Sequence, residues 1–165
     1  MDPRDGVVSA IALCIVGITA AAVNPSLLVL QLEDAETGER LGSHAIGEGE
    51  RFEVRYVHSF EGTEIRETYT AEDEGIVQVR EAYEYHAAGL EFTRETYRED
   101  GWIVSDVERE LGCFTVRVAG STEQSLVVGG TERSLEAYAE PGTGIELSIE
   151  RTSRAEHHAT NTRTR

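Results

Sequence analysis

RFEVRYVHSFEGTEIRETYT, residues 51–70, is the stretch of sequence that decides the fold. Its first half places Phe52, Val54 and Tyr56 at every second position, with charged residues between them, and the alternation continues to Phe60. A period of two is typical of a strand with one face buried and the other in solvent. This half is therefore predicted to be a strand on the surface of a β-sheet.

The second half of the same stretch predicts the partner strand. Residues 61–63 form a short glycine-containing turn, and Ile65, Glu67 and Tyr69 then alternate with polar residues. Two alternating segments joined by so short a turn are typical of a β-hairpin. We expect the hairpin to be antiparallel, with these three residues on one face.

The rest of the chain beyond residue 23 repeats the pattern of short strands separated by turns. Further strands are predicted at residues 27–32, 41–46, 76–85, 92–98, 102–107, 114–119, 125–128, 134–138 and 145–150. No segment has a sustained helical period. Residues 24–151 are therefore predicted to form one all-β domain, an antiparallel β-sandwich or flattened barrel. Residues 152–165 lack apolar periodicity and are predicted to be a disordered tail, with His157 and His158 solvated.

The charge of the chain is strongly negative. Its 31 acidic and 15 basic side chains give a net charge of -16, and every basic residue is Arg. Residues 24–151 carry -17, because residues 1–23 contribute -1 and residues 152–165 contribute +2. This composition is typical of a halophilic protein, since molar salt shortens the screening length to about 3 Å. It excludes nucleic-acid binding, which needs a basic patch. Two Cys exclude a disulfide scaffold.

The N-terminus contains an uncharged run, residues 6–23, that predicts one hydrophobic helix. Eighteen residues make a helix of about 27 Å, close to a hydrocarbon core of about 30 Å. We favour a retained membrane anchor with the domain outside, since Arg4 precedes the run. The alternative is a signal peptide cleaved near Ala22, after which the domain is secreted.

His58 is the first candidate functional residue. It falls on the apolar face of the predicted strand, where an imidazole needs a hydrogen-bond partner or a ligand. A carboxylate of the return strand, Glu64 or Glu67, would make it a metal or acid–base set. The alternative is a structural His bonded to a Tyr hydroxyl or a backbone carbonyl. Ser59 points to the opposite face, so no nucleophile pair forms, and the sequence predicts no catalytic residue, metal or cofactor.

A family resemblance starts from these residues. The run Tyr-Val-His-Ser-Phe-Glu at residues 56–61, followed by Glu67 and Tyr69, resembles the Y-x-H-S-x-E signature of the domain-of-unknown-function family 1850. Residues 85–90 resemble that family's aromatic–glycine segment, and residues 134–142 resemble its closing strand with Pro-Gly. The resemblance extends over residues 26–151.

The resemblance implies a small extracytoplasmic domain, N-terminally anchored and encoded beside tripartite transporters of the TAXI type. It implies no known reaction, and the motif residues that it points to as a ligand-binding site are His58, Ser59, Glu61 and Glu67. The expected function is an accessory or binding component of a TAXI-type solute transport system, with the membrane subunit or the solute-binding protein as partner. The alternative is an exported metal-binding module or hydrolase that uses the His58 hairpin.

Overall fold

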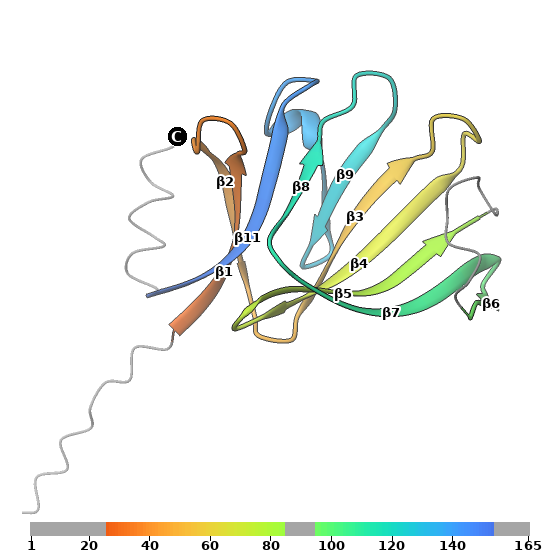
Figure 1. Ribbon diagram of the computed structural model, residues 1–165, viewed down its shortest axis with the longest axis horizontal. Helices are drawn as coiled ribbons and strands as arrows, with labels where there is room; N and C mark the ends of the chain where they lie inside the picture. Colours follow the sequence, from red (N-terminus) through yellow and green to blue (C-terminus); the bar gives the residue numbers. More distant parts are fainter. Residues whose placement is uncertain (1–25, 85–94, 154–165) are drawn as a thin grey trace, which may run out of the picture.

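The computed structural model describes residues 26–84 and 95–153, and these residues form a two-layered β-sandwich (Figure 1). A four-stranded sheet faces a seven-stranded sheet, and all strand pairs are antiparallel. The all-β sandwich expected from the sequence is confirmed. The N-terminal helix expected at residues 6–23 lies outside the described residues, as do His157, His158 and the segment 85–90.

The smaller sheet has the order β2-β1-β11-β8. Its strands are β1 (Ser26–Asp34), β2 (Arg40–Ile46), β8 (Phe114–Arg117) and β11 (Gly144–Ser153). The central pair, β1 and β11, is in register from Ser26 opposite Ser153 to Asp34 opposite Ile145. The last strand therefore extends two residues into the tail predicted at residues 152–165.

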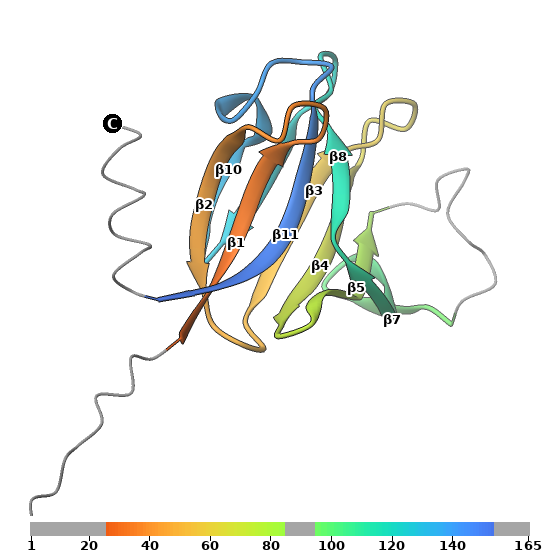
Figure 2. The ribbon, with the colours of Figure 1, turned by 60° about the vertical axis from the view of Figure 1, so that its left-hand side comes forward.

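The larger sheet has the order β10-β9-β3-β4-β5-β7-β6. Its strands are β3 (Arg51–Val57), β4 (Glu64–Glu72), β5 (Gly75–Tyr83), β6 (Tyr97–Glu99), β7 (Trp102–Gly112), β9 (Gln124–Val128) and β10 (Thr131–Ser134). The predicted hairpin is its centre, with Phe52 opposite Tyr69 and Val54 opposite Glu67. At one margin β7 continues into β8 with only Cys113 between them, so a single bent segment joins the two sheets (Figure 2).

The core lies between the sheets and is aliphatic on one side and aromatic on the other. Leu30 and Leu32 of β1 are fully buried against the larger sheet. Tyr69 stacks on Phe52 of its own sheet at 5.3 Å and on Phe114 of the other sheet at 4.5 Å. Because such ring pairs contribute about 0.5–1.5 kcal/mol beyond their buried area, this three-ring stack fastens the centre of the hairpin to the opposite sheet.

Several of the predicted strand assignments are wrong in their boundaries or type, and β7 runs to Gly112, five residues beyond the predicted end at residue 107. The strand predicted at residues 134–138 is not formed: β10 ends at Ser134, and a short 3-10 helix, η1 (Leu135–Ala137), follows. The Ser134 hydroxyl accepts a hydrogen bond from the Glu136 amide at 3.2 Å, which caps the turn as serine commonly does. The predicted strand 52–60 ends at Val57, so His58 lies beyond it.

Candidate functional site

The loop that joins β3 to β4 contains the family motif and is closed by hydrogen bonds. The His58 amide donates to the Thr63 carbonyl at 2.8 Å, and the Gly62 amide donates to the His58 carbonyl at 2.8 Å. Gly62 has φ of 67°, a left-handed conformation that glycine adopts without a steric penalty. The His58 side chain completes the closure, because its Nδ1 accepts from the Glu61 amide at 3.3 Å. The imidazole is therefore engaged with the backbone of its own loop.

This closed loop presents an aromatic ring to solvent. Phe60 lies between Ser59 and Glu61, and its side chain is 86% exposed. A large apolar side chain that is held out by an ordered loop is a feature typical of a contact point for another molecule. We call residues 58–63 the hairpin tip.

Glu67 occupies a different position, on the inner face of the hairpin. Its two carboxylate oxygens accept hydrogen bonds from two tyrosine hydroxyls, from Tyr56 at 3.1 Å and from Tyr69 at 2.6 Å. Tyr56 precedes the tip on β3, and Tyr69 follows Glu67 by two residues on β4. All three side chains face the smaller sheet because residues two apart on a strand share a face. We call these residues the Tyr–Glu–Tyr cluster.

The chemistry of the Tyr–Glu–Tyr cluster favours support of the fold over proton transfer. Burial, followed by the negative charge and hydrogen bond of Glu67, raises the pKa of both Tyr56 and Tyr69 above the usual tyrosine value. A hydroxyl whose pKa is raised keeps its proton at neutral pH and continues to donate it to the carboxylate. The arrangement therefore holds a half-buried carboxylate on the inner face of the hairpin with two uncharged donors.

A second carboxylate stands beside the cluster on the next strand. Glu81 of β5 is the cross-strand partner of Glu67 and faces the same side. It accepts a hydrogen bond from the amide nitrogen of Gln78 at 3.1 Å, and the Gln78 side chain is buried. The inner face of the larger sheet thus has a polar row through its middle, where the periodicity alone predicts apolar contacts.

The tip and the Tyr–Glu–Tyr cluster are separate places in the fold. Glu67 lies opposite Val54, and His58 follows Val54 by four residues, so about 13 Å of strand separates the two. Ser59 and Glu61 belong to the tip with His58. Across residues 26–84 and 95–153, no group of three or more His, Cys, Asp or Glu side chains is placed to hold a metal ion. The described part of the chain also contains no helix of the length and hydrophobicity that a membrane span requires.

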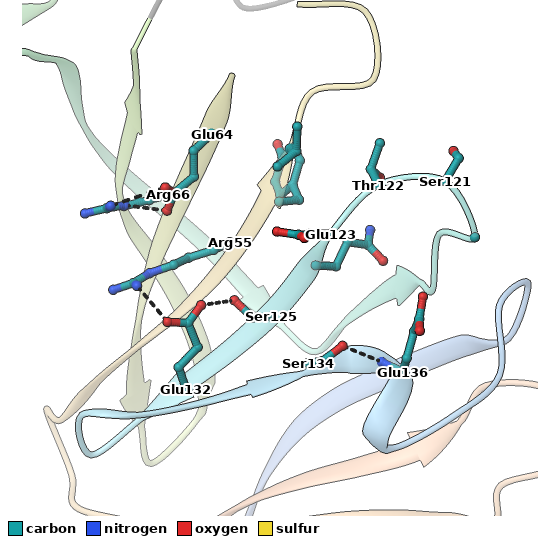
Figure 3. A pocket seen from close by; sticks show the side chains of 14 residues that line it. Arg55, Glu64, Arg66, Ser121, Thr122, Glu123, Ser125, Glu132, Ser134 and Glu136 are labelled. Atoms are coloured by element: carbon teal, nitrogen blue, oxygen red, sulfur yellow. Dashed lines mark hydrogen bonds and ion pairs between the residues drawn. The ribbon is translucent and has the colours of Figure 1, made fainter. Parts of the chain in front are cut away.

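A hollow of about 700 Å³ opens on the outer side of the hairpin, between β3, β4, β9 and η1 (Figure 3). Figure 3 shows Arg55 and Arg66 running in the same direction at one side of it, with the hydroxyls of Ser121 and Thr122 at the other. The carboxylate of Glu132 bridges Arg55, at 3.3 Å, and the Ser125 hydroxyl, at 2.6 Å. The hollow is therefore polar, and both of its arginines are paired, Arg55 with Glu132 and Arg66 with Glu64.

A second histidine, His44 on edge strand β2, is not singled out by its sequence pattern. Its Nε2 lies 2.7 Å from the Tyr138 hydroxyl, and the two rings meet edge to face at 5.9 Å. Burial, followed by the positive charge of Arg133, lowers the pKa of His44. Gly42 allows this approach, because a Cβ there would come within 2.9 Å of the Tyr138 ring. No sequence signal pairs these residues, since 94 positions separate His44 from Tyr138.

These observations define a class: an all-β sandwich domain whose central hairpin combines a closed, Phe-bearing tip with an internal Tyr–Glu–Tyr cluster. A comparison with protein families identifies the family of this domain. The model described as "Domain of unknown function (DUF1850)" matches residues 52–135, just over half of the chain, and the protein belongs to the DUF1850 family. The match runs from β3 to the start of η1, a narrower span than the 26–151 of the sequence resemblance. No curated protein and no solved structure matches the chain.

Proposed function

We propose that this protein is an anchored extracytoplasmic accessory subunit of a TAXI-type solute transport system, and that it binds its partner through the hairpin tip. The observation that carries the proposal is the 86% exposure of Phe60 on a loop closed by backbone hydrogen bonds and by His58. A loop that is already ordered loses little conformational entropy on binding, so its exposed ring is suited to act as an anchor.

The place of the tip in the fold favours one of the two expected partners. In both ribbon views the start of β1 and the β3–β4 turn lie at opposite ends of the sandwich (Figures 1 and 2). If residues 6–23 anchor the chain, the tip points away from the membrane surface. This direction favours the extracytoplasmic solute-binding protein over the membrane subunit as the partner.

The other motif residues then have supporting roles. The His58 ring closes the loop that presents Phe60, and Glu67 holds the base of the hairpin through the two tyrosines. We therefore interpret the motif residues as those that make the hairpin rigid. The metal-module alternative draws no support from the described residues, since they contain no group of three or more His, Cys, Asp or Glu side chains placed to hold a metal ion.

The test is co-purification from mildly solubilised membranes in high salt, with the full chain tagged. Phe60→Ser should lose the solute-binding protein and keep the melting temperature of the parent, because the ring is almost fully exposed. The matched control is Tyr97→Ser, since Tyr97 is the other exposed large aromatic in the described residues, at 43%. It should retain the partner.

His58→Gln gives an independent check of the same proposal. Loss of the Nδ1 acceptor frees the Glu61 amide and loosens the tip. Capture of the partner should then weaken while the sandwich stays folded. Retention of the solute-binding protein by both Phe60→Ser and His58→Gln would contradict the proposal, and retention of the membrane subunit alone by the parent would select the other partner.

A further inference from the structure

His58 uses only one of its two ring nitrogens within the hairpin tip. Its Nδ1 accepts a hydrogen bond from the Glu61 amide at 3.3 Å. An imidazole nitrogen that accepts a hydrogen bond carries no proton, so the ring is neutral and its single proton is on Nε2. Closure of the tip therefore also fixes the tautomer of His58, and it makes Nε2 a hydrogen-bond donor.

This Nε2–H donor has no partner within residues 26–84 and 95–153, and it is open to solvent. In these ranges, the buried side-chain polar atoms without a hydrogen-bond partner are Gln31 Oε1 and Thr63 Oγ1. The Nε2 atom of the half-buried His58 is unpartnered and is not one of them, so it is accessible from outside. A donor that is held in one direction by a closed loop needs little ordering when a partner binds.

Phe60 is close to this donor on the same loop. Its Cα atom is within about 7.6 Å of that of His58, because consecutive Cα atoms are about 3.8 Å apart. Ser59 between them is exposed, as is the Phe60 ring. A partner that buries the ring in an interface of ordinary size, which includes about 20–30 residues a side, also covers the imidazole. A donor that is covered without an acceptor weakens binding, so the partner must supply an acceptor.

The charge of the tip favours an uncharged acceptor. Glu61 directly follows Phe60, and its backbone amide, not its carboxylate, forms the bond to His58. The negative charge of that carboxylate has no ion-pair partner in the described part of the chain, and the net charge of the whole chain is -16. A carboxylate on the partner would therefore be repelled, whereas a carbonyl oxygen would not.

We propose, building on the proposed function, that the tip recognises a carbonyl oxygen at the rim of an apolar pocket on the solute-binding protein. The pocket takes the Phe60 ring, and the carbonyl oxygen accepts a hydrogen bond from His58 Nε2–H. The two nitrogens of one imidazole then have two roles. Nδ1 orders the loop through the Glu61 amide, and Nε2 contributes to the choice of partner.

Nuclear magnetic resonance of the full chain with isotopically labelled histidine tests the two roles directly, in detergent and molar salt. The His58 signals are identified by their absence from the spectrum of His58→Asn. At neutral pH the parent should show an unprotonated Nδ1 and a protonated Nε2, and addition of the unlabelled solute-binding protein should shift the Nε2 signal. A proton on Nδ1, or an Nε2 signal that stays unchanged when the partner binds, overturns the proposal.

Two substitutions of His58 separate the two nitrogens, because the amide oxygen of Asn can replace Nδ1 and the amide nitrogen of Gln can replace Nε2. His58→Asn should keep the tip protected from hydrogen exchange and bind immobilised solute-binding protein about three- to tenfold more weakly. His58→Gln should lose the protection. Parent-like affinity in His58→Asn with a protected tip overturns the proposal.

Glu61→Gln is the matched control, since it keeps the backbone amide that closes the loop and removes only the charge. Its affinity should equal that of the parent, and a clear gain would mean a charged acceptor and overturn the proposal. Phe60→Ser keeps this result distinct from that of the proposed function. Retention of the partner by Phe60→Ser contradicts the proposed function itself, whereas its loss together with an unshifted Nε2 signal in the parent overturns only the recognition of a carbonyl.

Discussion

The inner and outer faces of the β3–β4 hairpin satisfy their carboxylates in different ways. On the inner face, Glu67 accepts hydrogen bonds from the uncharged hydroxyls of Tyr56 and Tyr69. On the outer face, Glu64 forms an ion pair with Arg66, two residues away on the same strand. The two carboxylates thus have different kinds of partner. Glu67 is half-buried on the face toward the smaller sheet, whereas Glu64 and Arg66 lie on the opposite face with side chains 32% and 34% exposed.

The difference follows from the free energy of desolvation. Burial of two opposite charges costs more than burial of one carboxylate that has two hydroxyl donors, since each ion loses its hydration. In solvent the arginine keeps most of its hydration, and the pair is screened by salt. The contribution of the inner-face cluster to stability should therefore depend on pH, and that of the outer-face ion pairs on salt concentration.

The largest effect is expected from salt. Lowering it from about 2 M to about 0.1 M lengthens the screening distance from about 3 Å or less to about 10 Å. Residues 24–151 carry a charge of -17, so repulsion among the outer carboxylates should outweigh the arginine pairs, and cooperative folding should be lost. Melting curves of the full chain by circular dichroism check this. An unchanged melting temperature over that range would refute the prediction.

The next largest effect is a loss of stability at alkaline pH, caused by the tyrosines of the inner face. The raised pKa values of Tyr56 and Tyr69 mean that the folded protein keeps protons that the unfolded chain releases above about pH 10. Stability is therefore complete below pH 10 and is lost as pH rises, at up to about 1.4 kcal/mol per pH unit for each tyrosine. Denaturant unfolding at pH 9 to 11 measures the slope, and Tyr69→Phe should reduce it. A slope equal to the parent's in Tyr69→Phe would argue against the cluster.

A smaller loss of stability is expected at acidic pH, from His44. This residue lies on the inner face of the smaller sheet, also beside a tyrosine hydroxyl. Its lowered pKa means that the unfolded chain binds a proton before the folded protein does. Stability should therefore fall as pH drops below about 6.5, and level off once the folded imidazole is also protonated. Unfolding free energies between pH 7 and pH 5 detect the step. It should disappear in His44→Gln; if it persists there, another group is responsible.

The smallest effect is expected on the outer face. Arg55→Gln removes the ion pairs of Arg55 with Glu53 and Glu132. The Arg55 and Glu53 side chains are 25% and 30% exposed, so the change should cost about 0–1 kcal/mol in the free energy of unfolding. Tyr69→Phe on the inner face should cost more at neutral pH, about 1.5–3 kcal/mol, because it removes a hydrogen bond to a charged group. Equal losses in the two variants would mean that burial does not separate the two faces.

The period of two in residues 51–70 was enough to predict the hairpin and the face shared by Glu67 and Tyr69. It overestimated the first strand by three residues, because the alternation continues through His58 and Phe60 into the loop. Loop closure depends on the Gly62 turn and on backbone bonds between specific residues. A hydrophobicity pattern contains no information on those bonds. For this reason His58 was predicted on the strand, although it lies in the loop.

The candidate site was predicted only in part for a related reason. The residues of the motif are those that build the hairpin, but their grouping into a tip and an inner cluster depends on where the strand ends. The hollow on the outer face of the larger sheet, lined by Thr68 and several arginines, was not predicted at all. Arg51, Arg66 and Arg80 lie on three strands, and only the pairing of β3, β4 and β5 brings them around Thr68.

By itself, the amino-acid sequence determined the all-β class, the central hairpin, the charge of the chain and its membership of the DUF1850 family, because composition, period and motif are local or additive properties. The tertiary structure alone decided which partners the polar side chains have. Tyr138 reaches His44 from 94 residues away, and Phe114 of one sheet stacks on Tyr69 of the other. Such contacts depend on how the two sheets pack, and packing is a collective result of all the buried side chains.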